Sequence, residues 1–329
     1  MRPPSQPLPP LSVIFVTFNS AKTIGAALSS VRTYLPDAQI IVVDNGSTDA
    51  TCEIIRTVVG VRLIEGHGNV GFGAGVNLGA RAAVSELLLA LNPDTTVTHV
   101  DTDGLRDIAR LSPFGMRACL VRAGTRDIYL RHADWGWRRE LCWVLMLWFL
   151  VPRELSVRRP TSRLKKPRLW VSGAAFAISR AEFLRLGGFD EEFFLYFEDV
   201  DLSRRYRQLG AQVGTTDAIV VTHQGQGSWS VQSEEQIQSW ELLSLLQLVA
   251  KWRGEREAER AAKTALRLLA IISAVGRLAR SVPLIGPRAL RKSRSAAVVK
   301  VKLLDNSETL PVDNVYARGR AALASVTKE

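Results

Sequence analysis

The sequence contains little cysteine, no long apolar run and no signal-peptide pattern. Its 329 residues include three cysteines, whose spacing indicates neither a disulfide framework nor a structural zinc site, so a reducing compartment fits best. The first ten residues are rich in proline and lack the basic-then-apolar order of a signal peptide. The longest apolar stretch, 141–151, is shorter than the roughly 18–20 residues that cross a bilayer. We therefore expect a protein that is soluble or peripherally bound to a membrane.

Acidic residues are the minority among the charged ones. The chain has 43 lysines and arginines against 32 acidic residues, a formal net charge of +11, which predicts an anionic partner. The surplus gathers between residues 251 and 300, outside the polar motifs described below, and no nucleic-acid-reading motif is present. We therefore expect no nucleic-acid partner, and an anionic membrane surface or a phosphorylated substrate instead.

The first hundred residues alternate short apolar runs with helical patterns, which is typical of βαβ units and a mainly parallel sheet covered by helices. The expected strands are Leu11–Thr17, Gln39–Asp44, 61–65 and Leu87–Leu91, and the expected helices are 21–34 and 48–58. A basic, tryptophan-rich stretch from about 131 to 168 is interpreted as an insertion. After it we expect regular structure at 169–178, helices from Arg180 and through 199–208, a strand at 219–222, and helices over 234–280.

Polar residues follow three of the expected strands, namely Thr17 and Asn19, Asp44 and Asn45, and Asn92 and Asp94. Ligands of open α/β sheets bind at this carboxyl edge. Asp44 can accept a hydrogen bond from the N3–H of a uracil or thymine ring, or it can simply begin a turn. The glycine-dense segment 66–75 leads into a helix and can bring its backbone close to a phosphate, although it does not match a dinucleotide-binding fingerprint.

Four further side chains are candidates for chemistry. Asp94 can hold Mg²⁺ or Mn²⁺ if substrate diphosphate oxygens complete the coordination, or it can be a turn residue. Glu198 and Asp199 stand at a helix start, where the helix dipole favours acids, and one of them can take a proton from a hydroxyl group. His223 follows an apolar strand and is either a structural histidine or a ligand for Mn²⁺.

Six segments, taken in order, resemble family 2 of the inverting glycosyltransferases, and particularly its bacterial rhamnosyltransferase-like branch. They are VTFNS (16–20), VVDNGSTD (42–49), GNVGFGAGVNLG (68–79), LNPDT (91–95), WVSGAAFAISR (170–180) and GGFDEEFFLYFEDVDLSRR (187–205). The resemblance implies a Rossmann-like GT-A fold with a mainly parallel central sheet, to which the C-terminal helices are added. It extends from residue 13 to about 228.

The resemblance also implies roles for single residues. Asp199 corresponds to the catalytic base, with Glu198 as the competing base, while Asp94 and His223 correspond to ligands of a divalent metal, Mg²⁺ or Mn²⁺. Asn92 replaces the first acid of the family's metal motif. The residues implied to surround the nucleotide-sugar are Thr17, Asn19, Asp44, Asn45, Asn69, Asn92, Trp170, Ser172 and Gly173.

Within this branch, enzymes move L-rhamnose from dTDP-rhamnose to an N-acetylglucosaminyl diphosphate polyprenol during cell-envelope assembly. The resemblance therefore implies a nucleotide-sugar donor, a lipid-linked saccharide acceptor, and a cytoplasmic enzyme bound peripherally to the inner face of the plasma membrane. The alternatives are a UDP-sugar donor, a nucleotidyltransferase and a non-catalytic binder of anionic surfaces.

The expected organisation has four parts: a flexible N-terminus (1–10), a catalytic domain (11–230) that includes the insertion, a helical region (231–282) and a loosely ordered basic tail (283–329). In the helical region, Leu266, Leu269, Ile272 and Val275 recur every three residues. This apolar stripe either lies on anionic lipid, with arginines around it, or packs on neighbouring protein.

Overall fold

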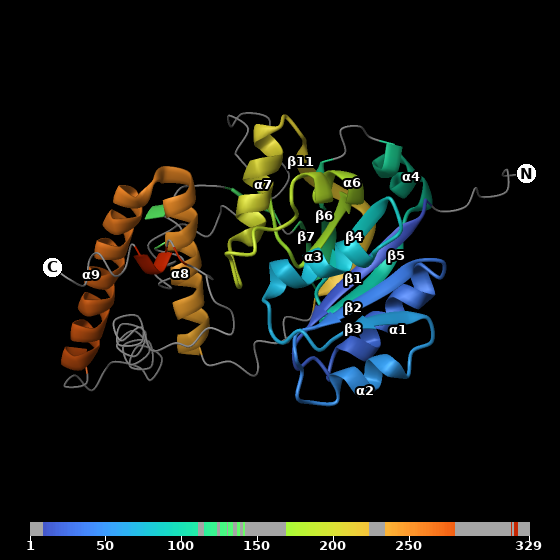
Figure 1. Ribbon diagram of the computed structural model, residues 1–329, viewed down its shortest axis with the longest axis horizontal. Coiled ribbons are helices and arrows are strands. Elements are labelled where there is room, and N and C mark those ends of the chain that lie inside the picture. Colours follow the sequence, from blue (N-terminus) through green and yellow to red (C-terminus); the bar gives the residue numbers. More distant parts are fainter. Residues whose placement is uncertain are drawn as a thin grey trace, which may run out of the picture. The chain divides into compact units, whose positions relative to one another are not determined.

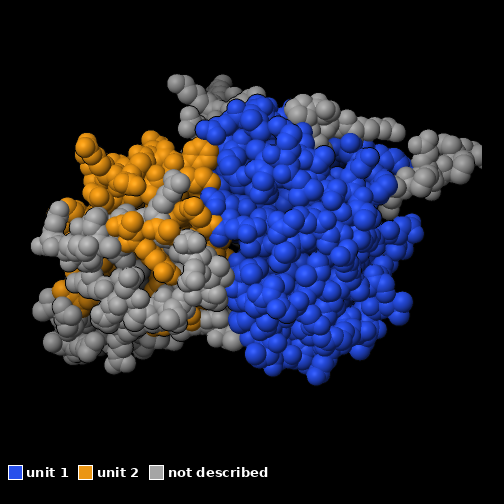
Figure 2. Space-filling model, in the orientation of Figure 1, with its two compact units in different colours: residues 1–134, 154–191, 198–230 blue, residues 135–153, 192–197, 231–329 orange. Residues whose placement is uncertain are grey.

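The computed structural model describes residues 9–110, 115–123, 126–129, 131–133, 137–138, 141, 169–223, 234–279, 317 and 319–321. The chain divides into two compact units (Figure 2). The sheet unit comprises residues 1–134, 154–191 and 198–230, and the helical unit comprises residues 135–153, 192–197 and 231–329. One limit of this division falls between residues 230 and 231, and the helical unit also takes in segments 135–153 and 192–197 from within the range 11–230.

The first half of the sheet unit follows the expected βαβ order (Figure 1). Its elements are β1 (Leu11–Thr17), α1 (Ile24–Tyr34), β2 (Gln39–Asp44), α2 (Thr51–Arg56), β3 (Val61–Ile64), α3 (Phe72–Ala82) and β4 (Leu87–Leu91). All residues of β1 and β4 are buried, which is why apolar residues predominate in both strands. Strands β3, β2, β1 and β4 lie side by side and parallel, so the parallel sheet predicted from the sequence is confirmed here.

The second half adds strands of mixed direction. These elements are β5 (Thr95–Val100), α4 (Thr102–Arg110), β6 (Met116–Ala123), β7 (Arg126–Tyr129), β8 (Arg131–Ala133), β9 (Leu169–Val171), β10 (Ala175–Ser179), α6 (Arg180–Arg185), α7 (Glu198–Gln208) and β11 (Val213–His223). The main sheet runs β3-β2-β1-β4-β10-β6-β11-β5, with β7 beside β6. β10 is antiparallel to both β4 and β6, whereas β11 is parallel to β6 and antiparallel to β5.

β8 and β9 form a separate antiparallel pair. The expected insertion at 131–168 therefore begins in β8 and ends immediately before the partner strand β9. Apart from β8 and residues 137, 138 and 141, the expected insertion lies outside the described residues. Residues 1–8 and all of residues 283–329 except 317 and 319–321 also lie outside them.

Helix α3 packs unusually close to β1 because glycine faces the strand. A Cβ atom at Gly79 would lie 2.5 Å from Cγ2 of Ile14, and one at Gly75 would lie 2.8 Å from Cγ1 of Val16. Both partners are buried side chains in the middle of the core, so they have no room to move. The glycines of segment 68–79 thus serve helix-to-sheet packing as well as the loop that precedes the helix.

We expect Gly79→Ala to destabilise the protein by about 1–3 kcal/mol, because overpacking a core outweighs the gain in helix propensity. Gly25→Ala in α1 is the matched control, since a Cβ there would meet Ile54 at an ordinary 3.6 Å. This control should be neutral or stabilising by up to about 1 kcal/mol. Chemical denaturation of both variants measures the difference, and equal free energies of unfolding would contradict the close-packing explanation.

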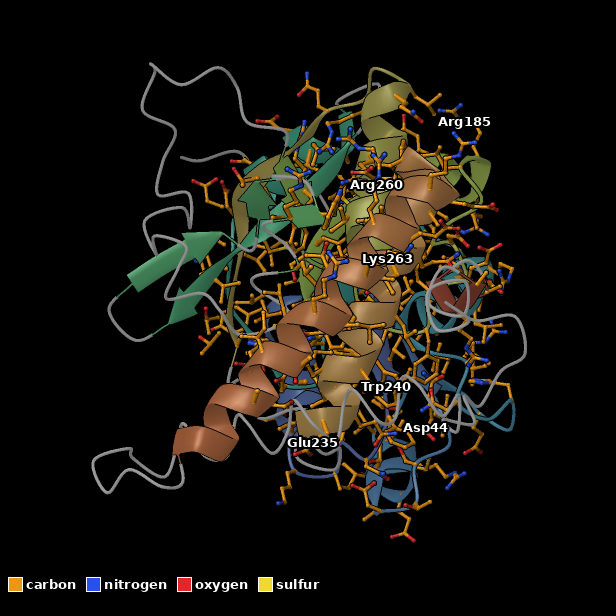
Figure 3. The ribbon with its side chains drawn as sticks, turned by 90° about the vertical axis from the view of Figure 1, so that its left-hand side faces the viewer. Asp44, Arg185, Glu235, Trp240, Arg260 and Lys263 are labelled. Atoms are coloured by element: carbon orange, nitrogen blue, oxygen red, sulfur yellow. The ribbon has the colours of Figure 1, made fainter. Side chains whose placement is uncertain are left out.

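The helical unit is a hairpin of α8 (Glu234–Arg253) and α9 (Glu255–Ala279), which turns at Gly254 with φ of 89°. Its core includes Leu269 at 0% exposure, with Leu266 and Ile272 packed against it. The expected apolar stripe of α9 therefore packs against protein and not lipid, which was the second of the two interpretations. The side chain of Val275, the last residue of the stripe, lies outside the described residues. Arg260 and Lys263 lie on α9 and Trp240 on α8 (Figure 3). Within the described part of the chain, no helix is long and apolar enough to span a bilayer.

Candidate active site

The Asp44 carboxylate organises the connection that follows β2. Its side chain is 2% exposed, and Oδ1 accepts hydrogen bonds from the hydroxyls of Thr17 (2.8 Å) and Ser47 (2.6 Å). Oδ2 accepts from the backbone N–H groups of Gly46 (3.1 Å) and Ser47 (2.8 Å). Four donors occupy both oxygens, which favours the turn interpretation of Asp44. Direct recognition of a pyrimidine by Asp44 stays a prediction.

Two asparagines tie neighbouring loops together. Asn19 has a left-handed backbone, with φ of 49°, and its Oδ1 accepts from the N–H groups of Thr48 (2.8 Å) and Asp49 (3.3 Å). Asn45 donates from Nδ2 to the Gly71 carbonyl at 3.0 Å. Oδ1 of Asn45 is buried and has no hydrogen-bond partner among the described residues. A buried acceptor without a donor is costly, so Asn45 is the better placed of these side chains to accept from a ligand.

Asn69 completes this corner, because its Oδ1 accepts from the Gly71 N–H at 3.1 Å. Gly71, with φ of 88°, is the residue from which α3 begins. Asn45 and Asn69 therefore both bind Gly71: Asn45 donates to its carbonyl, and Asn69 accepts from its N–H. The structure brings together the loops after β1, β2 and β3, as expected for one edge of a parallel sheet.

Asp94 and His223 come together through the pairing of β5 with β11. The register places His223 opposite Thr95, and Nε2 of His223 lies 3.2 Å from Oδ1 of Asp94. That histidine nitrogen is buried, and within the described chain it has no partner of hydrogen-bond geometry. Asp94 is 4% exposed. The structure therefore brings together Asp94 and His223, and their role as metal ligands stays a prediction.

This pair fits a divalent cation with an incomplete protein shell. Two ligands on adjacent positions of an octahedral ion, each about 2.1–2.2 Å from it, are about 3 Å apart, which is the spacing of the Asp94 and His223 atoms. No cluster of three or more histidine, cysteine or acidic residues suited to a metal occurs among the described residues.

Asp199 is held by two backbone donors at the start of α7. Its Oδ2 accepts from the Gly173 N–H at 3.0 Å and its Oδ1 from the Val200 N–H at 2.8 Å. Burial raises the pKa of Asp199 to about 6, although these hydrogen bonds oppose the shift. One turn later on the same helix face, Ser203 accepts from the Val171 N–H at 3.1 Å. The carboxylate is therefore fixed in position and is a stronger base than an exposed aspartate.

Glu198 is equally buried but is held less firmly. Its Oε2 has no hydrogen-bond partner among the residues the structure describes. Burial, followed by the neighbouring Asp199 charge, raises the pKa of Glu198 well above its usual range. Two acids that resist ionisation side by side are a frequent feature of catalytic sites. Both members of the predicted acid pair therefore stay candidates, with Asp199 the more rigidly placed.

A short chain of contacts joins the metal-site turn to the acid pair. The Asn92 N–H donates to the Ala174 carbonyl at 2.8 Å, and the adjacent Gly173 donates to Asp199. A Cβ at Gly173 would lie 2.7 Å from the ring of Phe72, the first residue of α3. Gly173 thus lies where the turn after β4, the start of α3 and the start of α7 converge.

The remaining predicted sugar-pocket residues lie on the strand that leads into this point. Trp170 is in β9, opposite His132 of β8, and the Ser172 hydroxyl accepts from the Ala174 N–H at 3.4 Å. These contacts shape the turn between β9 and β10. The prediction that Trp170, Ser172 and Gly173 line a sugar pocket stays a prediction.

Two supporting residues of the site were not predicted from the sequence. Asn77 in α3 donates to the Phe189 carbonyl (2.9 Å) and accepts from the Phe189 N–H (2.8 Å). Arg205 donates to Asp201 (2.8 Å) and to the carbonyls of Leu186 and Gly188. An asparagine inside an apolar helix was the available signal for Asn77. Both residues brace the loop that precedes the acid pair.

Comparisons with known proteins show which family the chain resembles. The family model for glycosyl transferase family 2 matches residues 12–104. An N-acetylglucosaminyl-diphospho-decaprenol L-rhamnosyltransferase of Mycobacterium tuberculosis is 31% identical over 221 residues, which cover 61% of this chain and 71% of that protein. The rhamnosyltransferase WbbL of Escherichia coli is 24% identical over 226 residues, 64% of this chain and 82% of that protein.

Solved structures show the same fold at low sequence identity. GalNAc-T7 with UDP, GalNAc and Mn²⁺ has a TM-score of 0.55 and 20% identity; the match covers 79% of this chain, but the chain spans only about half (52%) of that protein. The mannosyltransferase PcManGT of Pyrobaculum calidifontis with GDP-Man and Mn²⁺ has a TM-score of 0.50 and 18% identity, with 92% and 88% of the two chains covered.

Fold and relatives together define a glycosyltransferase with the GT-A fold. The chain belongs to glycosyl transferase family 2. This membership confirms the family resemblance found in the sequence, and it removes the nucleotidyltransferase and the non-catalytic binder as alternatives.

Proposed function

We propose that this glycosyltransferase moves L-rhamnose from dTDP-rhamnose to a polyprenyl-diphosphate-linked saccharide such as N-acetylglucosaminyl diphosphate polyprenol. The supporting observation is the buried Asp199, whose donor Gly173 is followed by Ala174, the residue that accepts from the Asn92 N–H in the turn that carries Asp94. The mycobacterial relative, 31% identical, is named for rhamnose transfer to a decaprenyl-diphosphate-linked sugar. The product would serve cell-envelope polysaccharide synthesis.

In the proposed reaction, Asp199 accepts the proton of the acceptor hydroxyl as that oxygen attacks the anomeric carbon of the donor. The bond from that carbon to the leaving diphosphate breaks as the new glycosidic bond forms, and the configuration inverts. The two N–H groups on Asp199 fix its carboxylate without occupying all of its lone pairs. Glu198 is the competing base on the same turn of α7.

Asp94 and His223 would hold the divalent cation, Mg²⁺ or Mn²⁺, and donor diphosphate oxygens would complete its shell. When bound, such a cation neutralises negative charge on the departing nucleoside diphosphate. Thr17, Asn19, Asp44, Asn45, Asn69 and Asn92 would surround the nucleotide end of the donor. Among them, Asn45 offers the buried acceptor oxygen described above, while Asp44 acts by shaping the loop.

The proposed acceptor is anchored in a membrane, so the enzyme would work at the cytoplasmic membrane surface. Exposed basic residues on α9 support this placement, because Arg256, Arg260 and Arg267 recur at spacings of four and seven and share one helix face. Binding would be peripheral and electrostatic. The apolar stripe of α9 would not contribute, since it faces protein.

A thermal-shift panel tests the donor. At about 100 times its Kd, a ligand that binds only the folded state adds about 2.7 kcal/mol, and we expect dTDP-rhamnose with Mn²⁺ to raise Tm by about 5–10 °C. UDP-glucose, UDP-N-acetylglucosamine and GDP-mannose are the controls and should shift Tm by much less. A larger increase in Tm with a UDP-sugar would identify that sugar nucleotide as the donor in place of dTDP-rhamnose. The proposed reaction class would not change.

A further inference from the structure

The segment that leads into the catalytic acids belongs to the helical unit, whereas the acids themselves belong to the sheet unit. This acid-leading segment, residues 192–197, is followed directly by Glu198 and Asp199 at the start of α7. Phe193 is 0% and Phe194 3% exposed. The chain therefore passes from the helical unit to the sheet unit between Phe197 and Glu198.

One face of α8 holds the acid-leading segment. Trp240, Ser244, Gln247 and Lys251 are spaced by four, three and four residues, which places them on a single side of the helix. The Trp240 and Phe194 rings meet edge to face at 5.2 Å, and the Lys251 ammonium lies 5.9 Å from the centre of the Phe193 ring.

The two middle residues of this face make hydrogen bonds to the segment. The Ser244 hydroxyl donates to the Leu195 carbonyl at 2.6 Å, and Gln247 Nε2 donates to Glu192 Oε2 at 2.5 Å. Ser244 and Gln247 are both 0% exposed. Buried polar groups with specific partners fix geometry more strictly than apolar contacts do.

The backbone of the acid-leading segment is strained. Tyr196 and Phe197 adopt φ values of 71° and 63° in succession, a left-handed conformation that is unfavourable for large side chains. Such residues persist only where their surroundings hold them, and they cluster at functional sites. Here Tyr196 and Phe197 pack against the core of the helical unit, and they lead directly into Glu198 at the start of α7.

We infer that Ser244 and Gln247 of α8 are positioning residues, which hold the acid-leading segment and thereby set the position of Asp199 for proton transfer. The inference rests on the proposed role of Asp199 as the base. Neither residue contacts the reacting atoms. Misplacement of a catalytic group by about 1 Å can lower turnover about 100-fold, so the loss of either hydrogen bond should lower kcat while leaving donor binding intact.

The test compares Ser244→Ala with Ser239→Ala in the full-length protein. Both serines are buried in α8, but the Ser239 hydroxyl donates only within its own helix, to the Glu235 carbonyl at 2.8 Å. We expect Ser244→Ala to lower kcat about 10–100-fold with donor Kd changed less than about twofold. Ser239→Ala should leave both quantities within about twofold. Gln247→Met keeps the side-chain length but loses both the donation to Glu192 and the hydrogen bond that Gln247 accepts from the Gly319 N–H. It is a second variant and should behave like Ser244→Ala.

Hydrogen–deuterium exchange of the peptide covering residues 192–200 gives a readout that does not depend on the reaction. Exchange should be faster in Ser244→Ala than in Ser239→Ala or the wild type. Unchanged exchange in both Ser244→Ala and Gln247→Met would overturn the inference even if the enzyme proves to use another donor. Faster exchange with normal kcat would also overturn it, because the segment would then be held without positioning the base.

Discussion

Asp199→Asn should lower kcat about 10²–10⁴-fold, the contribution typical of a general base. Asparagine cannot take up the hydroxyl proton. Its amide can also accept from only one of the two backbone donors at Gly173 and Val200, so its Nδ2 would face the other. Donor affinity, measured by the thermal shift, should be retained because these contacts lie at the acceptor side of the proposed reaction.

Glu198→Gln is the matched variant for this experiment. Both acids are buried on the first turn of α7, but Glu198 lacks the two backbone donors that fix Asp199. We expect kcat of Glu198→Gln to fall less than about tenfold. The reverse ranking of the two variants would assign the base to Glu198. In the wild type, kcat/KM should rise with pH through about 6, because Asp199 must be ionised to accept a proton and burial raises its pKa to about 6.

Asp94→Ala should lower kcat/KM about 10²–10³-fold, the loss typical when one stabiliser of developing charge is removed. The dependence of the rate on Mn²⁺ concentration should be lost with it. His223→Ala should lower kcat/KM less than Asp94→Ala does, because the negative charge of a carboxylate attracts the cation and a neutral imidazole lacks that charge. Initial rates over a Mn²⁺ titration measure both effects.

The control for the metal pair is Asp217→Asn, which changes an exposed acid on β11, the same strand that carries His223. Its rate and its response to Mn²⁺ should match those of the wild type. If Asp94→Ala kept a normal Mn²⁺ response, the cation would have to be held elsewhere and the assignment of Asp94 and His223 would fail.

The sequence predicted the parallel half of the sheet better than the mixed half. β1, β2 and β4 have the expected bounds because nearly all of their residues are buried, so apolar residues predominate in them. β5 was missed: it reads Thr-Thr-Val-Thr-His-Val and is the last strand in the order of the main sheet among the described residues. The predicted run 169–178 is two strands, separated by the turn at Gly173 that binds Asp199.

The candidate site was predicted residue by residue from short motifs, but the partners of these residues were not. The four donors to Asp44 come from segments on both sides of it, and Asn77 binds Phe189 across 112 positions in the sequence. Motifs report which residues gather at the carboxyl edge of the sheet. They cannot report contacts that depend on how distant loops pack, and the contacts of α8 with residues 192–195 are of the same kind.

The buried acid pair has a consequence for how the protein responds to acidity. Because the pKa of Asp199 in the folded chain lies above that of an unfolded aspartate, the side chain favours folding most when it is protonated. That favourable contribution is lost as the pH rises through about 6, which is where the carboxylate becomes able to act as a base. Protonation of Asp199 therefore increases the stability of the fold but prevents the side chain from acting as the base. The active, ionised form of the enzyme is the less stable one.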